Sequence, residues 1–256
     1  MTTPPRNVSI DGLRGLLAAY VVLAHAFEWS SVEWPLPAPG IAVVIFFLIS
    51  GYVLTPTWTG HYGEFLIRRF VRLWPVYAFA LASSAALFGT RLAWTDFAFY
   101  PLFPDHAVMY GDGPVWSLRV EAWMMLAFPL IIWGGKSLPR AVAVSLMMAV
   151  ANCAIPGASF GALFVFGGYC ARYRFSLRLL DWGLLQWLGK ISYSLYLTHW
   201  LVIRFCVQNL PGVAPALCVI AALVVAQIVC VLIETPSIDL SRKAGSFVTR
   251  AKTAIA

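Results

Sequence analysis

Ionisable side chains occur inside segments of this chain that are otherwise apolar. An ionisable group within a lipid bilayer costs several kcal/mol, with estimates from about 2.5 kcal/mol upward, unless it is paired or hydrated. Such residues are therefore the first candidates for function. The sequence places seven of them in apolar segments: Arg14, His25, Arg119, Glu121, His199, Arg204 and Glu234.

Arg14 and His25 are eleven positions apart in the sequence. Eleven residues make almost three turns of an α-helix, so the two side chains share one face and are separated by roughly 16 Å along the axis. A cation at one end of a helix and an imidazole deeper on the same stripe predict one wall of a substrate channel. The alternative is an arginine that snorkels to the interface and a histidine that is hydrogen-bonded within the bundle.

The segment from Glu64 to Trp74, EFLIRRFVRLW, is rich in arginine. Arg69 and Arg72 are three positions apart and project from the same helix face. Two interpretations remain open for this face. Guanidinium groups bind phosphate well, which would make it a phosphate clamp. It would otherwise belong to an amphipathic helix that lies at the membrane surface and binds anionic lipid headgroups.

A carboxylate lies in the segment GPVWSLRVEAWMMLAFP, residues 113–129. This is Glu121, and a buried carboxylate can orient an imidazole and stabilise its protonated form. The alternative is that Glu121 and Arg119 neutralise each other locally. Residues two positions apart do not face each other on a helix, however, so each group needs a partner elsewhere.

Hydroxyl groups accompany a histidine in the segment GKISYSLYLTHWL, residues 189–201. Ser192, Tyr193 and His199 either serve the chemistry or join membrane helices by hydrogen bonds. Glu234, directly before Thr-Pro, is most simply a residue at a helix terminus. These polar positions need helices that bring them together.

The composition places most of these segments in a membrane. The chain has 256 residues, of which 61% are hydrophobic and only 11% charged, and its mean hydropathy is +0.79. Soluble domains carry roughly 25% charged residues. These values exclude an ordinary soluble domain and a disordered chain. They predict an all-α fold, a polytopic transmembrane helical bundle, with a single integral membrane domain over residues 1–256.

A membrane-spanning helix needs roughly 20 mostly apolar residues. By this measure we predict about eight spans, at residues 12–29, 40–56, 73–89, 115–133, 140–155, 158–171, 191–207 and 214–233. The stretch Trp94–Phe103 is aromatic but too short to cross, so we expect an interfacial or re-entrant segment there. The polar residues 1–11 do not resemble a cleavable signal peptide, so we expect the first span to be retained.

Basic residues are distributed unevenly between the predicted loops. The net charge is +7, and nearly all lysines and arginines outside the spans fall on the side of the N-terminus, whereas Arg91 lies on the other side. Basic residues accumulate on cytoplasmic loops, so both termini are predicted to be cytoplasmic, and no nucleic-acid partner is expected. The five cysteines form no cluster with histidine, so no metal site is expected.

Six blocks of the sequence form a recognisable series: SIDGLRGLLAAYVVLAHA at 9–26, FFLISGYVLT at 46–55, FLIRRFVRLWPVY at 65–77, WSLRVEAWMMLAFP at 116–129, GKISYSLYLTHWLV at 189–202 and IETP at 233–236. In this order they resemble the acyltransferase-3 family of integral membrane O-acyltransferases. The region between Pro129 and Gly189 is shorter than is usual in that family. The resemblance implies transfer of an acyl group from cytosolic acyl-CoA, most often acetyl-CoA, to a hydroxyl of a cell-envelope carbohydrate or glycolipid. It also implies a place in the bacterial inner membrane, among its lipids.

The resemblance extends to single residues. Arg14 and His25 match the family's arginine and histidine with ten residues between them. Arg69 and Arg72 match its RxxR pattern, and Glu121 matches the glutamate that follows WSL. The histidine of the late block is matched as well.

The resemblance and the residue patterns together imply one reaction scheme. His25 would act as general base toward the acceptor hydroxyl, and Glu121 or another carboxylate would hold its imidazole. The catalytic group is expected to consist of His25, Glu121 and Arg14. The donor site, which would bind the phosphates of CoA, is expected at Arg14, Arg68, Arg69 and Arg72. Substrate contacts are expected from Tyr52, Ser192, Tyr193 and His199.

Three alternatives to this scheme remain open. His25 could carry the acyl group transiently instead of acting as a base. The chain could instead be a transporter or flippase for a lipid-linked sugar, because such proteins are also polytopic and carry charges in mid-membrane. It could also be a catalytically inactive scaffold, since its middle region is contracted.

Overall fold

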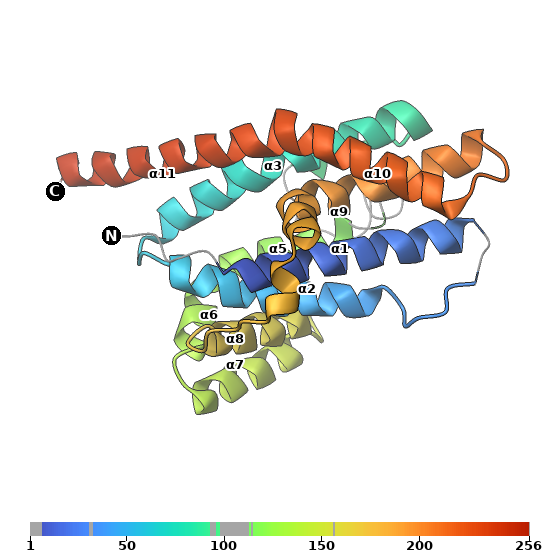
Figure 1. Cartoon of the computed structure of the whole chain (residues 1–256). Coiled ribbons are helices and arrows are strands. Elements are labelled where there is room, and N and C mark those ends of the chain that lie inside the picture. Colours follow the sequence, from blue (N-terminus) through green and yellow to red (C-terminus); the bar gives the residue numbers. More distant parts are fainter. Residues whose placement is uncertain are drawn as a thin grey trace. The chain divides into compact units, whose positions relative to one another are not determined.

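A computed structural model of the chain describes residues 7–30, 33–92, 96–97, 113, 115–155 and 157–255. Every regular element within these ranges is a helix (Figure 1). The α-helices are α1 (Val8–Trp29), α2 (Gly40–Leu54), α3 (Tyr62–Phe88), α5 (Val115–Leu126), α6 (Phe128–Gly134), α7 (Leu138–Ala151), α8 (Gly161–Cys170), α9 (Gly183–Asn209), α10 (Pro215–Val229) and α11 (Thr235–Ile255). The shorter elements include 3₁₀ turns (Thr55–Thr57, Ala158–Phe160, Arg178–Asp181) and a π-helical turn (Cys230–Glu234). The prediction of an all-helical fold is confirmed for the described residues.

Each of the eight predicted spans overlaps a described helix. Four described helices are long and apolar enough to cross a membrane: Val8–Trp29, Gly40–Thr57, Tyr62–Phe88 and Pro215–Gly245. A fifth is added if α5 and α6, which meet at a bend of 72°, count as one span. The chain is therefore an integral membrane protein. The count of eight and the cytoplasmic termini stay predictions.

Two predicted spans differ in their bounds from the described helices, and each contains a proline. The predicted span at 115–133 is broken between α5 and α6, where Pro129 lies at the start of α6. Proline lacks a backbone N–H and its ring clashes with the preceding turn, so a helix bends or restarts there. α3 instead runs through Pro75 and begins at Tyr62, well before the predicted residue 73. The arginine-rich segment is therefore continuous with a membrane helix.

The chain packs into two compact units. The first unit consists of residues 1–20, 37–58 and 117–190, and the second of residues 21–36, 59–116 and 191–256. α1 and α9 each contribute to both units. This packing does not test the prediction of a single domain over residues 1–256. Most of the predicted segment Trp94–Phe103 lies outside the described residues.

Glycines bring two helices of the first unit into backbone contact. A Cβ atom on Gly51 of α2 would collide with the backbone of Phe164, and one on Gly167 of α8 would collide with the backbone of Leu48. Small residues allow such close approach between membrane helices. Gly51, in the block FFLISGYVLT at 46–55, therefore serves the packing of α2 on α8. α8 lies beside α7 in Figure 1.

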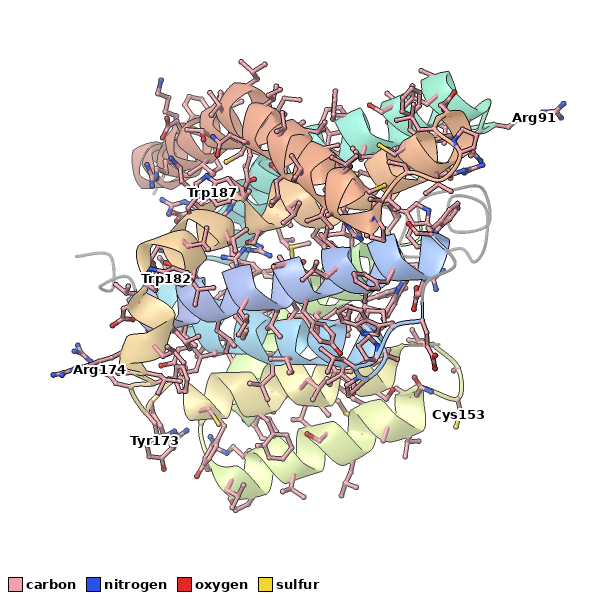
Figure 2. The ribbon with its side chains drawn as sticks, turned by 45° about the vertical axis from the view of Figure 1, so that its right-hand side comes forward. Arg91, Cys153, Tyr173, Arg174, Trp182 and Trp187 are labelled. Atoms are coloured by element: carbon pink, nitrogen blue, oxygen red, sulfur yellow. The ribbon has the colours of Figure 1, made fainter. Side chains whose placement is uncertain are left out.

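Basic residues of the first unit gather at one end of it. Arg172 donates a hydrogen bond to the carbonyl of Gly135, and Asn7 donates one to the carbonyl of Phe175 at 3.0 Å. The start of α1, the α6–α7 turn and the segment after α8 therefore meet. Figure 2 shows Tyr173 and Arg174 at this end and Cys153 at the opposite end. We call it the basic end; its cationic side chains are Lys136, Arg140, Arg172, Arg174 and Arg178.

In the second unit, α10 continues through the π-helical turn into α11, as Figure 1 shows. α11 packs along α3. π-Helical turns interrupt α-helices rarely and occur often at functional sites. The last predicted span, 214–233, thus ends inside the continuous helix that α10, the π-helical turn and α11 form.

Candidate active site

His25 and Glu28 are joined near the end of α1. Nδ1 of His25 lies 3.0 Å from Oε2 of Glu28, three residues further along the helix. Residues three apart lie on the same helix face, and α1 continues to Trp29, so the helix itself holds the carboxylate beside the ring. The imidazole is 19% exposed and the carboxylate 47% exposed, so a ligand can reach the pair.

This contact determines which ring nitrogen of His25 can act as a base. A carboxylate oxygen only accepts, so Nδ1–H donates to Glu28 and the lone pair stands on Nε2. Such an imidazole can take a proton from a hydroxyl, and the carboxylate stabilises the imidazolium that forms. A histidine oriented by a carboxylate is the arrangement by which many enzymes activate a hydroxyl.

Glu28 is absent from the predicted site residues, where Glu121 has the role of orienting His25. Position 28 falls at the end of the predicted first span, so its spacing of three from His25 was the signal that sequence reasoning missed. Glu121 lies half-buried on α5, in the first unit. The role of Glu121 toward His25 stays a prediction.

His199 of α9 lies against the His25 ring. The two ring centroids are 5.5 Å apart and the ring planes differ by only 17°. His199 is 0% exposed, and its Nδ1–H donates to the carbonyl of Leu195, one turn earlier, at 3.0 Å. Its Nε2 atom is buried and has no hydrogen-bond partner. The fold therefore brings together two histidines that are separated by 174 positions in the sequence.

Aromatic rings surround the imidazole pair. Trp200 meets His25 edge-on at 5.0 Å between centroids, and it meets Trp29 edge-on at 5.1 Å. The ring centroids of Tyr196 and His199 are 5.9 Å apart. Apolar aromatic walls keep water away from reacting groups, which strengthens electrostatic interactions at the site.

Arg69 and Arg72 lie half-buried on α3, in the turns before Pro75. Proline removes one backbone hydrogen bond of a helix and distorts the turn before it. Two carbonyls in that turn accept bonds from other helices. Ser237 of α11 donates to the carbonyl of Arg72 at 3.0 Å, and Tyr193 of α9 donates to that of Leu73 at 2.7 Å. The hydroxyl of Tyr193, predicted to contact substrate, thus also supports the RxxR segment.

Arg68, a predicted donor-site residue, has a carboxylate partner on its own helix. Its Nη2 lies 2.7 Å from Oε1 of Glu64, which is buried. A Cβ atom on Gly245 of α11 would collide with the Arg68 side chain. The Arg68 side chain therefore packs closely against α11, and its charge is partly neutralised by Glu64. Its binding of CoA stays a prediction.

Arg14 stands in the first unit, half-buried on α1. Within the described part of the chain, no acceptor or carboxylate pairs with its guanidinium group. Glycines on either side hold this part of α1 against its neighbours: a Cβ atom on Gly12 would meet the carbonyl of Leu180, and one on Gly15 would meet that of Leu185. The arrangement leaves a rigidly held cation available for an anion.

Tyr52 and Ser192 complete the predicted residues. The Tyr52 hydroxyl donates to the carbonyl of Tyr173 at 2.8 Å and accepts from the backbone N–H of Phe175 at 3.1 Å, so it joins α2 to the segment after α8. Ser192 is buried on α9. A search of the described residues finds no group of three or more metal-ligating side chains.

Sequence reasoning also missed a buried acidic contact in the second unit. The Ser194 hydroxyl donates to Oε2 of Glu234 at 2.5 Å, and the Ser194 backbone N–H lies 3.2 Å from the same oxygen. Glu234 closes the π-helical turn and is 4% exposed. It joins that turn to α9, the helix that carries His199.

The described residues combine apolar helices long enough to cross a membrane with an accessible imidazole–carboxylate pair. A comparison with known families identifies the class of protein. The acyltransferase-3 family model, described as an acyltransferase domain, matches residues 7–185. The chain therefore belongs to the acyltransferase-3 family. The match contains Arg14, His25, Arg69, Arg72 and Glu121 and ends before His199.

A curated protein is similar to part of the chain. A Rhizobium radiobacter protein named "Protein 2 in picA locus" is 39% identical over 93 residues, which are 33% of this chain and 47% of that protein. The match thus spans less than half of the relative's length. No solved structure matches the chain.

Proposed function

We propose that the protein transfers an acyl group, most often acetyl, from acyl-CoA to a hydroxyl group of a cell-envelope carbohydrate or glycolipid. The observation that carries this proposal is the contact between His25 and Glu28 in a chain of the acyltransferase-3 family. It supplies what transfer to a hydroxyl needs, namely an accessible imidazole with a free Nε2 and an anionic partner.

The chemical step follows from this geometry. Nε2 of His25 takes the proton of the acceptor hydroxyl while the oxygen attacks the thioester carbonyl carbon. The carbon–sulfur bond then breaks, and the CoA thiolate takes the proton from the imidazolium, which returns His25 to its starting state. Glu28 stabilises the positive charge in between.

Cationic side chains support an anionic donor. Arg14 is half-buried and has no partner among the described residues, while Arg69 and Arg72 share one face of α3. Guanidinium groups are suited to the phosphates of CoA. The basic end of the first unit lies at the start of α1, which supports the proposal that this end is cytoplasmic, where acyl-CoA is found. We further propose that both termini are cytoplasmic, that the chain crosses the membrane eight times, and that this membrane is the bacterial inner membrane.

Membrane vesicles from cells that express the chain, supplied with radiolabelled acetyl-CoA, test the proposal. We expect label in the glycan or glycolipid fraction with the wild-type protein and none with His25→Ala, which must insert and fold normally. Uptake or flipping of a lipid-linked sugar in proteoliposomes without acyl-CoA would instead indicate a transporter. Labelled histidine recovered after rapid quenching would indicate an acyl-His25 intermediate in place of direct transfer.

A further inference from the structure

The Nε2 atom of His199 is an unexplained hydrogen-bond acceptor inside the protein. Nδ1–H of this ring donates to a carbonyl oxygen, Leu195 O, so the lone pair stands on Nε2. Nε2 is buried and without a partner. A buried polar atom without a partner costs free energy, and native proteins hold few of them. The atom therefore points to a partner that arrives at some stage of the working cycle.

A role in joining helices does not account for this side chain. Among the described residues, His199 forms one hydrogen bond, to the carbonyl of Leu195 on the same helix. The residue is 0% exposed, and no carboxylate of the described residues pairs with it. Because burying an unpaired charge is very costly, the ring is held in its neutral form, in which Nε2 accepts.

The adjacent polar group is the His25 ring, 5.5 Å away between centroids. The His25 side chain is 19% exposed, whereas His199 is enclosed. Nε2 of His25 has no hydrogen to donate until it has taken a proton. The two rings then become complementary, with one Nε2–H donor and one Nε2 acceptor.

We propose that His199 is a positioning residue that accepts a hydrogen bond from the protonated form of His25. This inference rests on the proposed function. Once the acceptor hydroxyl has given its proton to His25, rotation of the His25 ring out of the stacked arrangement brings Nε2–H of the imidazolium to Nε2 of His199. The proton is thereby held away from the new ester oxygen until the carbon–sulfur bond breaks. The imidazolium then releases it to the CoA thiolate, and both imidazoles are neutral again.

Two substitutions separate this role from simple packing. His199→Phe keeps a ring in the buried site but has no acceptor, whereas His199→Gln offers an amide oxygen near the place of Nε2. In the vesicle assay with acetyl-CoA, we expect His199→Phe to lower the maximal rate about 10- to 100-fold, a part of the effect of a general base. The KM for acetyl-CoA should not change, and His199→Gln should recover most of the rate. The matched control is His61→Phe, because His61 is exposed and precedes α3; it should have no effect.

Each result decides between the two roles. The inference is overturned if folded His199→Phe keeps the full rate, or if His199→Gln is no more active than His199→Phe. A purely structural role predicts that Phe, which fills the site, does at least as well as Gln. Intrinsic fluorescence during heating reports whether each variant is folded.

A measurement without turnover separates failure of this inference from failure of the proposed function. In protein labelled with ¹⁵N-histidine, the signal that His199→Phe removes is assigned to His199. Acidification that protonates His25 should move the Nε2 resonance of His199 toward the hydrogen-bonded value in the wild-type protein. It should not do so in His25→Ala. An unmoved resonance overturns the inference even if acyl transfer is observed. If vesicles show no acyl transfer but the resonance of His199 moves, the proposed function is wrong and the hydrogen bond between His25 and His199 is supported.

Discussion

The hydroxyl of Ser194 lies 2.5 Å from the buried carboxylate of Glu234, which connects α9 with the π-helical turn between α10 and α11. The bond spans 40 positions of sequence. It holds the turn that precedes α11 against the helix that carries Tyr193 and His199.

Ser194→Ala is expected to destabilise the protein by about 1–3 kcal/mol, because the buried carboxylate loses its shortest hydrogen bond. Denaturant unfolding in detergent measures the change. The matched control is Ser145→Ala, which removes a hydroxyl that donates to the carbonyl of Ala141 on its own helix. That variant should change stability by less than about 0.5 kcal/mol. Equal effects of the two variants would show that Ser194 has no special role.

Glu28→Gln is expected to slow acetyl transfer about 10- to 100-fold, because the amide cannot supply the negative charge that stabilises the His25 imidazolium. The initial rate of label transfer from acetyl-CoA in vesicles is the measurement. Glu33→Gln, an exposed carboxylate beyond the end of α1, serves as control and should keep the wild-type rate. If both variants are fully active, His25 acts without Glu28.

Arg14→Ala is expected to raise the KM for acetyl-CoA about tenfold, because a charge-assisted hydrogen bond contributes roughly 1.5–3 kcal/mol. Arg14→Lys should restore this only in part, since an ammonium group lacks the bidentate geometry of guanidinium. Arg174→Ala removes a cation that Figure 2 shows projecting from the basic end, and it should leave the KM nearly unchanged. An unchanged KM in Arg14→Ala would remove Arg14 from the donor site.

Gly15→Ala is expected to destabilise the first unit by about 1–3 kcal/mol, because the new Cβ atom would collide with the carbonyl of Leu185. Gly40→Ala is the matched control. No atom lies within 4 Å of a Cβ built at Gly40, and alanine there reduces the freedom of the unfolded chain, so stability should stay or rise by about 0.4–1 kcal/mol. Thermal unfolding of both variants in detergent measures the change in stability. Wild-type stability of Gly15→Ala would contradict the close contact between α1 and the carbonyl of Leu185.

The helices and the family could be predicted from the sequence. Apolar segments of sufficient length indicate membrane helices wherever they occur, and each predicted span overlaps a described helix. The shared face of Arg14 and His25 follows from the 3.6-residue period alone. The contact of His25 with Glu28 was also within reach, because both residues lie on one helix. Such local relationships depend on backbone geometry that every helix repeats.

Contacts between helices could not be predicted in this way. Neither the stacking of His25 on His199 nor the bond from Ser194 to Glu234 is indicated by spacing, because many side chains must pack together before these groups meet. The same holds for Tyr193, whose hydroxyl supports the α3 backbone next to Arg72. The residue types inside apolar segments identified the polar residues, and the helical period identified the faces that carry them. Their partners were settled by close packing and by the need of each buried polar group for a hydrogen bond.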